Sequence, residues 1–418
     1  MNDFHYIKNE MYCEGVSISK IASDVGTPFY LYSHETLVRH FKAFETAFKE
    51  LPHLICYAAK ANSNLSILKI FGNLGGGADI VSGGELFRAL RAGIPPEKIV
   101  FAGVGKMRGE IASALRANIL MFNVESSQEL ALINEVAKSE GQIAPVALRV
   151  NPNIDPLTHP YISTGMKQSK FGIDIDLAMN GYLEARALSH IKVVGIHQHI
   201  GSQLTDLKPF VDALTKIAEF IRKLRANGIE ISILDIGGGL GITYDHESPP
   251  LPGQMAEALS PLLREIGCTV ILEPGRSLVG NAGALVSQVL FTKASSEKNF
   301  LVVDAGMSDL IRPALYQAYH EIKPVVQTDR PLRKVDVVGP VCESGDFFAK
   351  DREIIELVAG DLLAVMGAGA YGFSMASHYN SRPNIPEVLV RGDKYMIIRE
   401  REDYEDLIRR EKIPPGLL

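Results

Sequence analysis

The sequence lacks tryptophan, and its four cysteines stand alone, with no C-x-x-C pair among them. Zinc ribbons and disulfide-stapled domains need grouped cysteines, so we expect neither a metal site nor a disulfide framework. No uninterrupted apolar run reaches the roughly 18 residues of a membrane span. The first ten residues, MNDFHYIKNE, lack the apolar centre of a signal peptide. We therefore expect a cytoplasmic protein that is not embedded in a membrane.

An excess of basic residues is also missing. The chain carries 43 Lys and Arg against 49 Asp and Glu, a formal net charge of −6. A nucleic-acid partner is not expected, because such proteins need a dense basic face to neutralise phosphates. With 46% hydrophobic and 22% charged residues, the composition is typical of a globular enzyme and excludes a disordered or fibrous chain.

The length of 418 residues exceeds what one hydrophobic core usually fills, about 250–300 residues. Between residues 30 and 280, short apolar runs alternate with segments of helical periodicity. This alternation predicts an α/β fold, a (β/α)8 TIM-type barrel over 33–280, with a doubly wound open sheet as the alternative. The eight expected strands are Leu54–Tyr57, Ala78–Val81, Ile99–Ala102, Ile119–Phe122, Val146–Val150, Val193–His197, Ile231–Ile236 and Thr269–Leu272.

Beyond about residue 283 the pattern changes to strand-like runs separated by Gly-Asp turns, and long amphipathic helices are missing. We expect a second, mostly β domain formed by 1–32 and 281–418. Its expected strands are Ala284–Thr292, Phe300–Asp304, Val335–Val338, Glu353–Val358, Leu362–Val365 and Glu387–Arg391, joined by Tyr6–Tyr12 and Phe29–Tyr32.

Polar residues at the carboxyl ends of barrel strands are candidates for catalysis. Lys60 directly follows the first strand, where desolvation disfavours its ammonium form and makes it a candidate Schiff-base nucleophile. A lysine that reaches out to the rim is the alternative. Asp79 lies in the second strand, and the Ser-Gly-Gly-Glu motif after it is more simply a helix cap. His197 and His199 end the sixth strand; a lone histidine is usually structural, but two on one side of a strand favour a site.

Glycines gather after the seventh strand, at Gly237–Gly239, and the eighth strand ends in Glu273-Pro-Gly275-Arg276. Glycine allows backbone N–H groups to approach an anion, and phosphate sites of such barrels often use these two loops. The glycines could equally form tight turns. Their spacing does not fit the dinucleotide fingerprint.

A Schiff-base lysine, a phosphate cradle, an imidazole and a carboxylate are united by one cofactor, pyridoxal 5′-phosphate, an electron sink for carbanions. A carboxylate at Glu273 would keep the pyridine nitrogen protonated, whereas an arginine would leave it neutral and suit racemisation. Glu273 therefore favours loss of CO2 from an amino acid over a racemase of similar fold.

With these residues the chain resembles the diaminopimelate decarboxylases, members of the barrel-type, alanine-racemase-like pyridoxal-phosphate enzymes that include ornithine and arginine decarboxylases. The resemblance covers nearly the whole chain. Its motifs are Tyr57-Ala-Ala-Lys60-Ala-Asn62, Gly77-Ala-Asp79-Ile-Val-Ser-Gly-Gly-Glu85, His199-Ile-Gly-Ser-Gln203, Gly237-Gly-Gly239, Glu273-Pro-Gly-Arg276, Arg312-Pro-Ala-Leu-Tyr316, Cys342-Glu-Ser-Gly-Asp346 and Gly369-Ala-Tyr371-Gly.

The resemblance implies a carboxy-lyase that converts meso-2,6-diaminopimelate to L-lysine and CO2, the last step of lysine biosynthesis. It implies that Lys60 forms the Schiff base, that His199 stacks on the cofactor ring and that Glu273 pairs with its pyridine nitrogen. It also implies a homodimer with shared active sites, in which Cys342, the fourth catalytic residue, and Glu343 come from the partner subunit. The other implied cofactor contacts are Asp79, Ser202, Gly238, Gly275, Arg276 and Tyr371, and the implied substrate contacts are Arg276, Arg312, Tyr316, Glu343 and Tyr371.

The charges agree with this substrate, whose distal amino-acid group needs both a cation and an anion, and arginine suits bidentate carboxylate binding. A decarboxylase of another amino acid, including a carrier-linked or polyamine substrate, and a catalytically inactive relative with a binding role are alternatives. The segment Asn151–Ile173, rich in Pro, Asn, Ser, Thr and Gly, is interpreted as an active-site lid. One departure from the family pattern is His378, where asparagine is expected.

Overall fold

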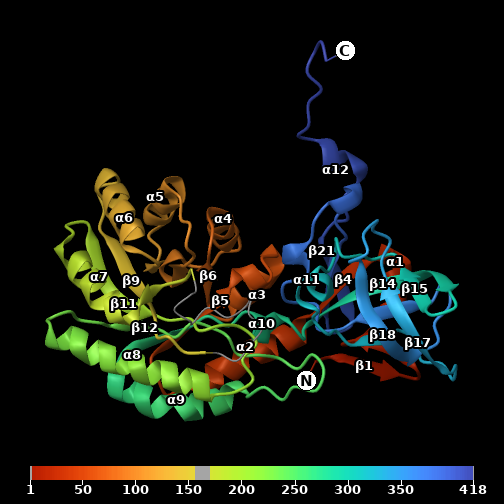
Figure 1. Ribbon diagram of the computed structural model, residues 1–418, viewed down its shortest axis with the longest axis horizontal. Helices are drawn as coiled ribbons and strands as arrows, with labels where there is room; N and C mark the ends of the chain where they lie inside the picture. Colours follow the sequence, from red (N-terminus) through yellow and green to blue (C-terminus); the bar gives the residue numbers. More distant parts are fainter. Residues whose placement is uncertain (1, 156–169, 418) are drawn as a thin grey trace. The chain divides into compact units, whose positions relative to one another are not determined.

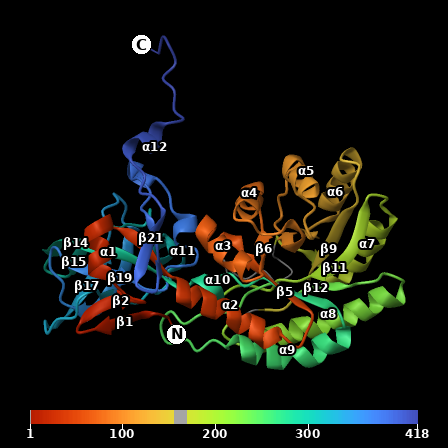
Figure 2. The same cartoon turned by 180° about the vertical axis from the view of Figure 1, so that it is seen from behind.

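The computed structural model describes residues 2–155 and 170–417, which Figures 1 and 2 show from opposite sides. The chain divides into two compact units, a barrel unit of Leu37–Val279 and a β unit of Met1–Thr36 with Gly280–Leu418. None of the helices described in these ranges has both the length and the apolar content that crossing a bilayer would require.

In the described part of the barrel unit, eight parallel strands form a closed ring in the order β5-β6-β7-β8-β9-β11-β12-β13. The ring closes because β13 pairs with β5 and β8 pairs with β9. The predicted barrel is therefore confirmed, and the open sheet is excluded because an open sheet leaves two edges unpaired. The strands are β5 (His53–Ala58), β6 (Gly77–Ile80), β7 (Ile99–Phe101), β8 (Met121–Val124), β9 (Ala144–Asn151), β11 (Ile191–His197), β12 (Ile233–Asp235) and β13 (Thr269–Leu272), with β10 (Ile173–Asp174) paired to β9.

Helices alternate with these strands and cover the outside of the barrel (Figure 1). One face of α8 (Lys208–Ala226), which includes Phe210, Leu214 and Leu224, is buried, and this helix contacts α9 (Pro252–Ile266) (Figures 1 and 2). Cys56, Val100 and Met121 contribute to an apolar cluster of strand residues in the barrel. The helices are α2 (His34–Phe48), α3 (Leu65–Asn73), α4 (Gly83–Arg91), α5 (Arg108–Ala117), α6 (Ser127–Ser139), α7 (Ile175–Ala187), α8 (Lys208–Ala226), α9 (Pro252–Ile266) and α10 (Arg276–Val279), with 3-10 turns η1 (Ala59–Ala61) and η2 (Pro96–Lys98).

The fourth barrel strand differs from its predicted position, Ile119–Phe122. Asn118 ends α5 in the left-handed conformation, with φ 58°, and β8 begins only at Met121. The strand runs on to Val124 and therefore includes Asn123. Asn123 is a buried polar residue that lies just beyond the end of the predicted strand.

The large sheet of the β unit has the order β18-β17-β15-β14-β4-β20-β21, with β19 paired to β14 and β16. Strand β4, near the N-terminus, lies between β14 and β20 from the C-terminal part, and all five of its residues are buried. The elements of this sheet are β4 (Phe29–Ser33), β14 (Gly283–Ala294), β15 (Asn299–Val303), β16 (Ile322–Pro324), β17 (Leu332–Val338), β18 (Phe347–Ile355), β19 (Leu362–Val365), β20 (Glu387–Arg391) and β21 (Lys394–Arg399).

A second, three-stranded sheet lies at the N-terminus. The run Tyr6–Tyr12, expected to join this domain, contains two strands: the chain reverses at Lys8 and Asn9, both with positive φ, and forms a hairpin. The shorter elements of the unit are β1 (Phe4–Ile7), β2 (Glu10–Cys13), β3 (Val16–Ser17), α1 (Ile18–Val25), α11 (Arg312–Tyr316), η4 (Phe373–Met375), η5 (Tyr379–Ser381) and α12 (Tyr404–Ile408).

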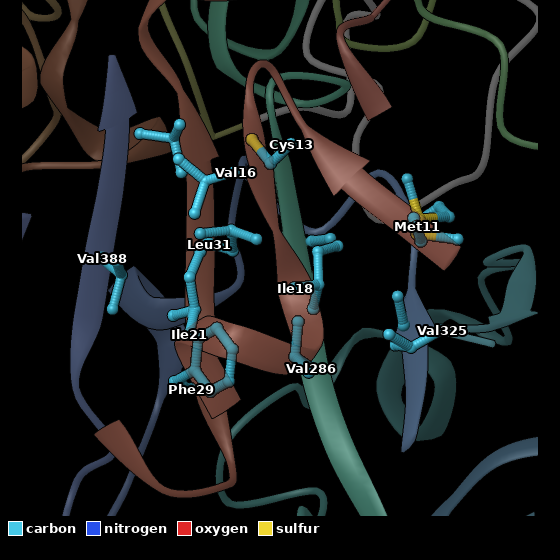
Figure 3. Packing of buried hydrophobic residues seen from close by; sticks show 14 residues of the cluster. Met11, Cys13, Val16, Ile18, Ile21, Phe29, Leu31, Val286, Val325 and Val388 are labelled. Atoms are coloured by element: carbon cyan, nitrogen blue, oxygen red, sulfur yellow. The ribbon is translucent and has the colours of Figure 1, made fainter. Parts of the chain in front are cut away.

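Side chains from the two ends of the chain pack into one apolar core in the β unit (Figure 3). Met11 and Ile18 come from the N-terminal elements, and Val286, Val325 and Val388 come from the C-terminal part. The β unit is therefore one packed body, although its sequence is interrupted by the whole barrel.

Candidate active site

Lys60 lies in η1, directly after β5, and its side chain turns toward a buried carboxyl group. Its Nζ donates to Oδ2 of Asp79 on β6 at 2.8 Å, and Asp79 is completely buried. Burial and the charge of Glu273 raise the pKa of Asp79 to about 7, against the opposing effect of Lys60. The amine is thus held among the strand ends by a carboxyl group that titrates near neutral pH.

A second buried carboxyl group, Glu273, follows β13 and belongs to a cluster at the carboxyl ends of the strands. Asn123 donates from Nδ2 to Oδ2 of Asp235 at 3.0 Å and to Oε1 of Glu273 at 3.3 Å. On the other side, Nε2 of His197 lies 3.5 Å from Oε2 of Glu273. One ligand-type atom from each of His197, Asp235 and Glu273 lies within 4.8 Å of the others.

Asp235 and Glu273 act as a coupled pair of carboxyl groups. Burial and then the negative charge of Glu273 raise the pKa of Asp235 well above its ordinary value. Burial alone would raise the pKa of Glu273 too, but His197, Lys60 and the hydrogen bond with Asp235 hold it below its ordinary value. The pair therefore keeps one proton on Asp235 and leaves Glu273 ionised near neutral pH.

The two histidines of the sixth strand have different surroundings. Strand β11 ends at His197, so the predicted alternation along a strand does not extend to His199. Nδ1 of His199 accepts a hydrogen bond from the Gly238 N–H at 3.2 Å, which requires an unprotonated nitrogen. Burial, followed by the charges of Arg149 and Lys60, lowers the pKa of His199 well below its ordinary value, so the imidazole is neutral.

The loops after β12 and β13 pack closely at the glycines. Gly237 has φ 70°, and a Cβ at Gly238 would lie 2.2 Å from the carbonyl oxygen of Glu273, so only glycine fits there. Next to these loops Arg276, 5% exposed, donates to Oγ of Ser202 and to the hydroxyl of Tyr244, with Nη1 2.7 Å from the latter. A buried guanidinium beside glycine-rich backbone is suited to binding an anion.

Arg312 and Tyr316, the predicted substrate contacts, lie on α11 of the β unit. Arg312 is buried, and its Nε donates to Nε2 of His320 at 3.3 Å. Its guanidinium carbon lies 5.8 Å from the centre of the Tyr316 ring. The guanidinium plane is thus fixed by neighbours within the β unit.

The other predicted residues of the β unit lie in loops. Cys342 and Glu343 are exposed, in the turn before β18, and Tyr371 has φ 55°. His378, the departure from the family pattern, has Nε2 2.6 Å from Oε2 of Glu402. It therefore forms a contact within the β unit.

Two further interpretations of the sequence concern segments beside the strand ends. Ser82 caps α4, accepting at Oγ from the N–H of Glu85 at 3.2 Å, so the simple helix-cap interpretation of this motif is right. Of the predicted lid, Asn151–Ile173, residues 156–169 lie outside the described part of the chain.

Asn123, Asp235 and Tyr244 were not predicted from the sequence as site residues. In the structure, each of them contacts a residue of the site. Asn123 contacts Glu273, and Tyr244 contacts Arg276. The available signal was a polar residue within or directly after an apolar strand, as at Asn123 and Asp235. Tyr244 carries no such signal, since it lies in a loop and reaches Arg276 only through the fold.

Comparisons with known proteins identify relatives of this chain. Residues 34–280 match the family model described as pyridoxal-dependent decarboxylase, pyridoxal binding domain. Diaminopimelate decarboxylase of Aquifex aeolicus is 51% identical, over 96% of both chains. The crystal structure of Helicobacter pylori diaminopimelate decarboxylase complexed with L-lysine is 47% identical, with a TM-score of 0.91 over 94% of this chain and 98% of that one. That from M. jannaschii is 41% identical, with a TM-score of 0.95 over 100% and 99%.

These similarities confirm the predicted fold class, the predicted pyridoxal-phosphate cofactor and the predicted enzyme class. A relative of this identity and coverage is sufficient to assign the family. The chain belongs to the diaminopimelate decarboxylase family of pyridoxal-dependent decarboxylases.

Proposed function

We propose that the protein removes CO2 from meso-2,6-diaminopimelate and produces L-lysine. The names of the relatives support this substrate, and so does the L-lysine in the Helicobacter pylori structure. The observation that carries the proposal is Glu273, a buried carboxylate kept ionised by its neighbours. Such a group can hold a proton on a ring nitrogen beside it.

The residues at the strand ends fit pyridoxal phosphate. Lys60 supplies a primary amine for its aldehyde, and Arg276, Ser202 and the backbone at Gly238 supply donors for its phosphate. Within the described residues, Nδ1 of His197 and one carboxyl oxygen of Asp79 are buried without a hydrogen-bond partner, as expected where a polar group completes a site. Bound there, the cofactor supplies an electron sink for the carbanion left when CO2 departs.

The chain's own residues then have separate tasks. Glu273 would hold the proton on the pyridine nitrogen, and Asp235 and Asn123 would keep its carboxylate in place. His199, held neutral, would present a flat uncharged ring to the face of the cofactor. Asp79 would orient the amine of Lys60.

We further propose that residues of the β unit read the distal end of the substrate and complete the site in a homodimer. Arg312 and Tyr316, with Arg276, would bind the distal carboxylate, and Tyr371 would contact the phosphate. Cys342 and Glu343 would act in the site of the partner subunit, with Glu343 on the distal ammonium. These roles rest on the sequence resemblance, and the fixed guanidinium plane of Arg312 supports bidentate carboxylate binding.

The experiment is an assay of CO2 release and product formation with meso-diaminopimelate, L-lysine, L-ornithine and L-arginine. We expect turnover with meso-diaminopimelate and little with the others, because they lack the second carboxylate that the arginines would bind. Lys60→Ala is expected to abolish turnover. Turnover of another amino acid in place of diaminopimelate would overturn the substrate, and wild-type turnover by Lys60→Ala would overturn the mechanism.

A further inference from the structure

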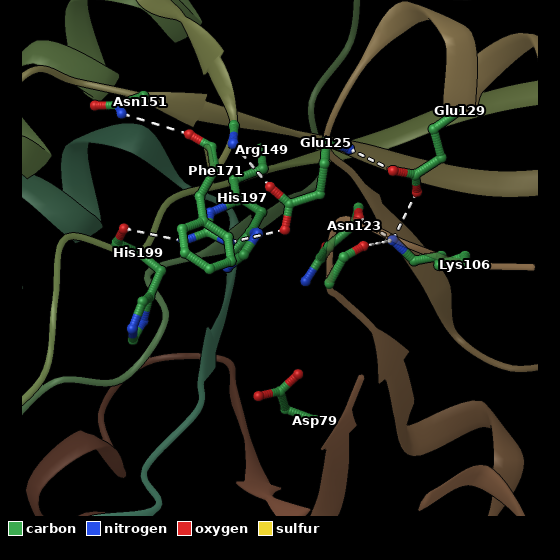
Figure 4. Close-up of polar contacts among 12 residues, drawn as sticks. Asp79, Lys106, Asn123, Glu125, Glu129, Arg149, Asn151, Phe171, His197 and His199 are labelled. Atoms are coloured by element: carbon green, nitrogen blue, oxygen red, sulfur yellow. Dashed lines mark hydrogen bonds and ion pairs between the residues drawn. The ribbon is translucent and has the colours of Figure 1, made fainter. Parts of the chain in front are cut away.

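A buried chain of charged side chains runs beneath the carboxyl ends of β8, β9 and β11 (Figure 4). Arg149, on β9, donates from Nη1 to Oε1 of Glu125 at 2.8 Å, and both side chains are less than a tenth exposed. Burial opposes the charge of Glu125, but Arg149 holds its pKa below the ordinary value, so the two form a true ion pair. A buried ion pair that contributes little to stability is often retained for geometry.

Each carboxylate oxygen of Glu125 has a different partner. Oε1 accepts from Arg149, whereas Oε2 accepts from the backbone N–H of Gly172 at 2.7 Å. The ring of Phe171, next to Gly172, lies 4.7 Å from the guanidinium carbon of Arg149 (Figure 4). Asn151 adds a hydrogen bond of 3.5 Å to the carbonyl oxygen of Phe171. Glu125 and Arg149 therefore fix the backbone at residues 171–172 to the barrel.

The same arginine also reaches the candidate site. Nη2 of Arg149 donates to the carbonyl oxygen of His199 at 3.4 Å, just beyond the end of β11. One guanidinium group thus connects Glu125, the Phe171 ring and the backbone of His199.

We propose that Glu125 is a positioning residue, which, through Arg149, holds the backbone of His199 and of residues 171–172 in the geometry that binds pyridoxal phosphate. The inference rests on the proposed function, because it takes His199 as the residue that stacks on the cofactor. The side chain of Glu125 is bonded to Arg149 and to the backbone of Gly172, so it acts on His199 through the guanidinium of Arg149.

The neighbouring residue Glu129 offers a matched control. Its Oε1 accepts from the ammonium of Lys106 at 2.6 Å, and its Oε2 accepts from the backbone N–H of Glu125 at 3.1 Å. Like Glu125, it is a buried glutamate that accepts from one cation and one backbone N–H. Unlike Glu125, it has Lys106 as its cationic partner, and not Arg149 (Figure 4).

The test compares Glu125→Gln with Glu129→Gln. A glutamine has a single oxygen and cannot accept from both partners, so Glu125→Gln releases either Arg149 or Gly172. We expect it to weaken pyridoxal-phosphate binding by the cofactor-free protein about tenfold or more and to change the visible circular dichroism of the bound cofactor. Hydrogen exchange in peptides covering residues 170–174 should become faster. Glu129→Gln should lower the unfolding temperature and weaken cofactor binding far less than Glu125→Gln does, because Glu129 contacts Glu125 only at its backbone N–H.

Two more variants separate positioning from simple loss of structure. Glu125→Asp keeps both oxygens and should recover part of the affinity. In the background of Arg149→Met, Glu125→Gln should cause a much smaller further loss of affinity, because only its bond to the Gly172 N–H is then left to lose. Equal losses in Glu125→Gln and Glu129→Gln, or an unchanged Kd in Glu125→Gln, would overturn the inference. Failure of the wild-type protein itself to bind the cofactor would instead count against the proposed function.

Discussion

Asp79 and Glu273 are two buried carboxyl groups that the same site holds in different protonation states. Asp79 is raised to a pKa of about 7 by burial and by the charge of Glu273, even with Lys60 beside it. The pKa of Glu273 is held below its ordinary value against burial, by His197, by Lys60 and by the hydrogen bond with Asp235. Glu273 is thus a carboxylate suited to a protonated ring nitrogen, whereas Asp79 is a carboxyl group with a raised pKa beside the amine of Lys60.

The raised pKa of Asp79 predicts a pH dependence of stability in the cofactor-free protein. Between about pH 4 and 7 the folded chain keeps a proton on Asp79 that the unfolded chain has lost, so the contribution to the free energy of unfolding falls as the pH rises. Asp79→Asn cannot titrate, and its stability relative to wild type should increase over this window by at most about 3–4 kcal/mol. Unfolding in urea at pH 5 and pH 8 measures the difference.

Glu85, also in this region, provides the comparison for that experiment. Burial raises the pKa of Glu85 too, against the hydrogen bond that its carboxylate accepts from the backbone N–H of Val81. Glu85→Gln retains an oxygen for this bond, so its stability relative to wild type should change with pH in the same direction as that of Asp79→Asn, and by less. If Asp79→Asn and wild type lose stability in parallel from pH 5 to pH 8, the assigned titration of Asp79 is wrong.

At the scale of single elements, the pairing of β6 with β7 depends on one glycine. A Cβ at Gly77 would lie 1.9 Å from the carbonyl oxygen of Lys98, a backbone atom that cannot move without its strand. Gly109, near the start of α5, has no heavy atom within 4 Å of the same position. Gly77 is therefore required for steric reasons, whereas at Gly109 there is room for a larger side chain.

This contrast predicts opposite effects of the same substitution. Gly77→Ala should destabilise the barrel unit by about 3 kcal/mol or more, because it forces two strands apart. Gly109→Ala should stabilise it by about 0.4–1 kcal/mol, because alanine restricts the unfolded chain and favours the helix. Thermal unfolding of both variants tests this, and a stable Gly77→Ala protein would show that β6 tolerates displacement.

An element could be predicted from the sequence where neighbouring residues alone determine it. The eight barrel strands could be predicted because each is an apolar run of its own, and Lys60 and Glu273 because each stands directly after such a run. The end of β8 could not, since it depends on the left-handed Asn118 that precedes it. The contact between Tyr244 and Arg276 joins residues 32 positions apart, and no local pattern announces it.

At the scale of the whole molecule, the β unit is formed by both ends of the chain, and the sequence of the barrel lies between them. Strand β4 is the junction, since it pairs with β14 and β20 of the C-terminal part. The residues proposed to read the distal end of the substrate belong to this unit, except Arg276 of the barrel, and those proposed to hold the cofactor belong mainly to the barrel. The proposed homodimer would bring Cys342 of one copy to Lys60 of the other.

The dimer predicts that two inactive variants restore each other. Lys60→Ala and Cys342→Ala are each expected to lose most of their activity. Dimers formed by unfolding and refolding an equal mixture should recover about a quarter of the wild-type activity, because half of them contain one intact site. Refolding each variant alone supplies the control. Recovery no greater than the sum of the two variants would place Lys60 and Cys342 of the same chain in one site.

Strand β4 also has a consequence for synthesis. The chain between Ser33 and Gly283 is made before the first of its partners exists. At about 5–20 residues per second, this takes roughly 10–50 s. Throughout that interval, while the segments of the barrel are being translated, β4 is an apolar strand with neither edge paired, and it includes Phe29, Tyr30 and Tyr32. A chain truncated before Gly283 should therefore hold a folded barrel and an unpaired N-terminal strand that requires a chaperone.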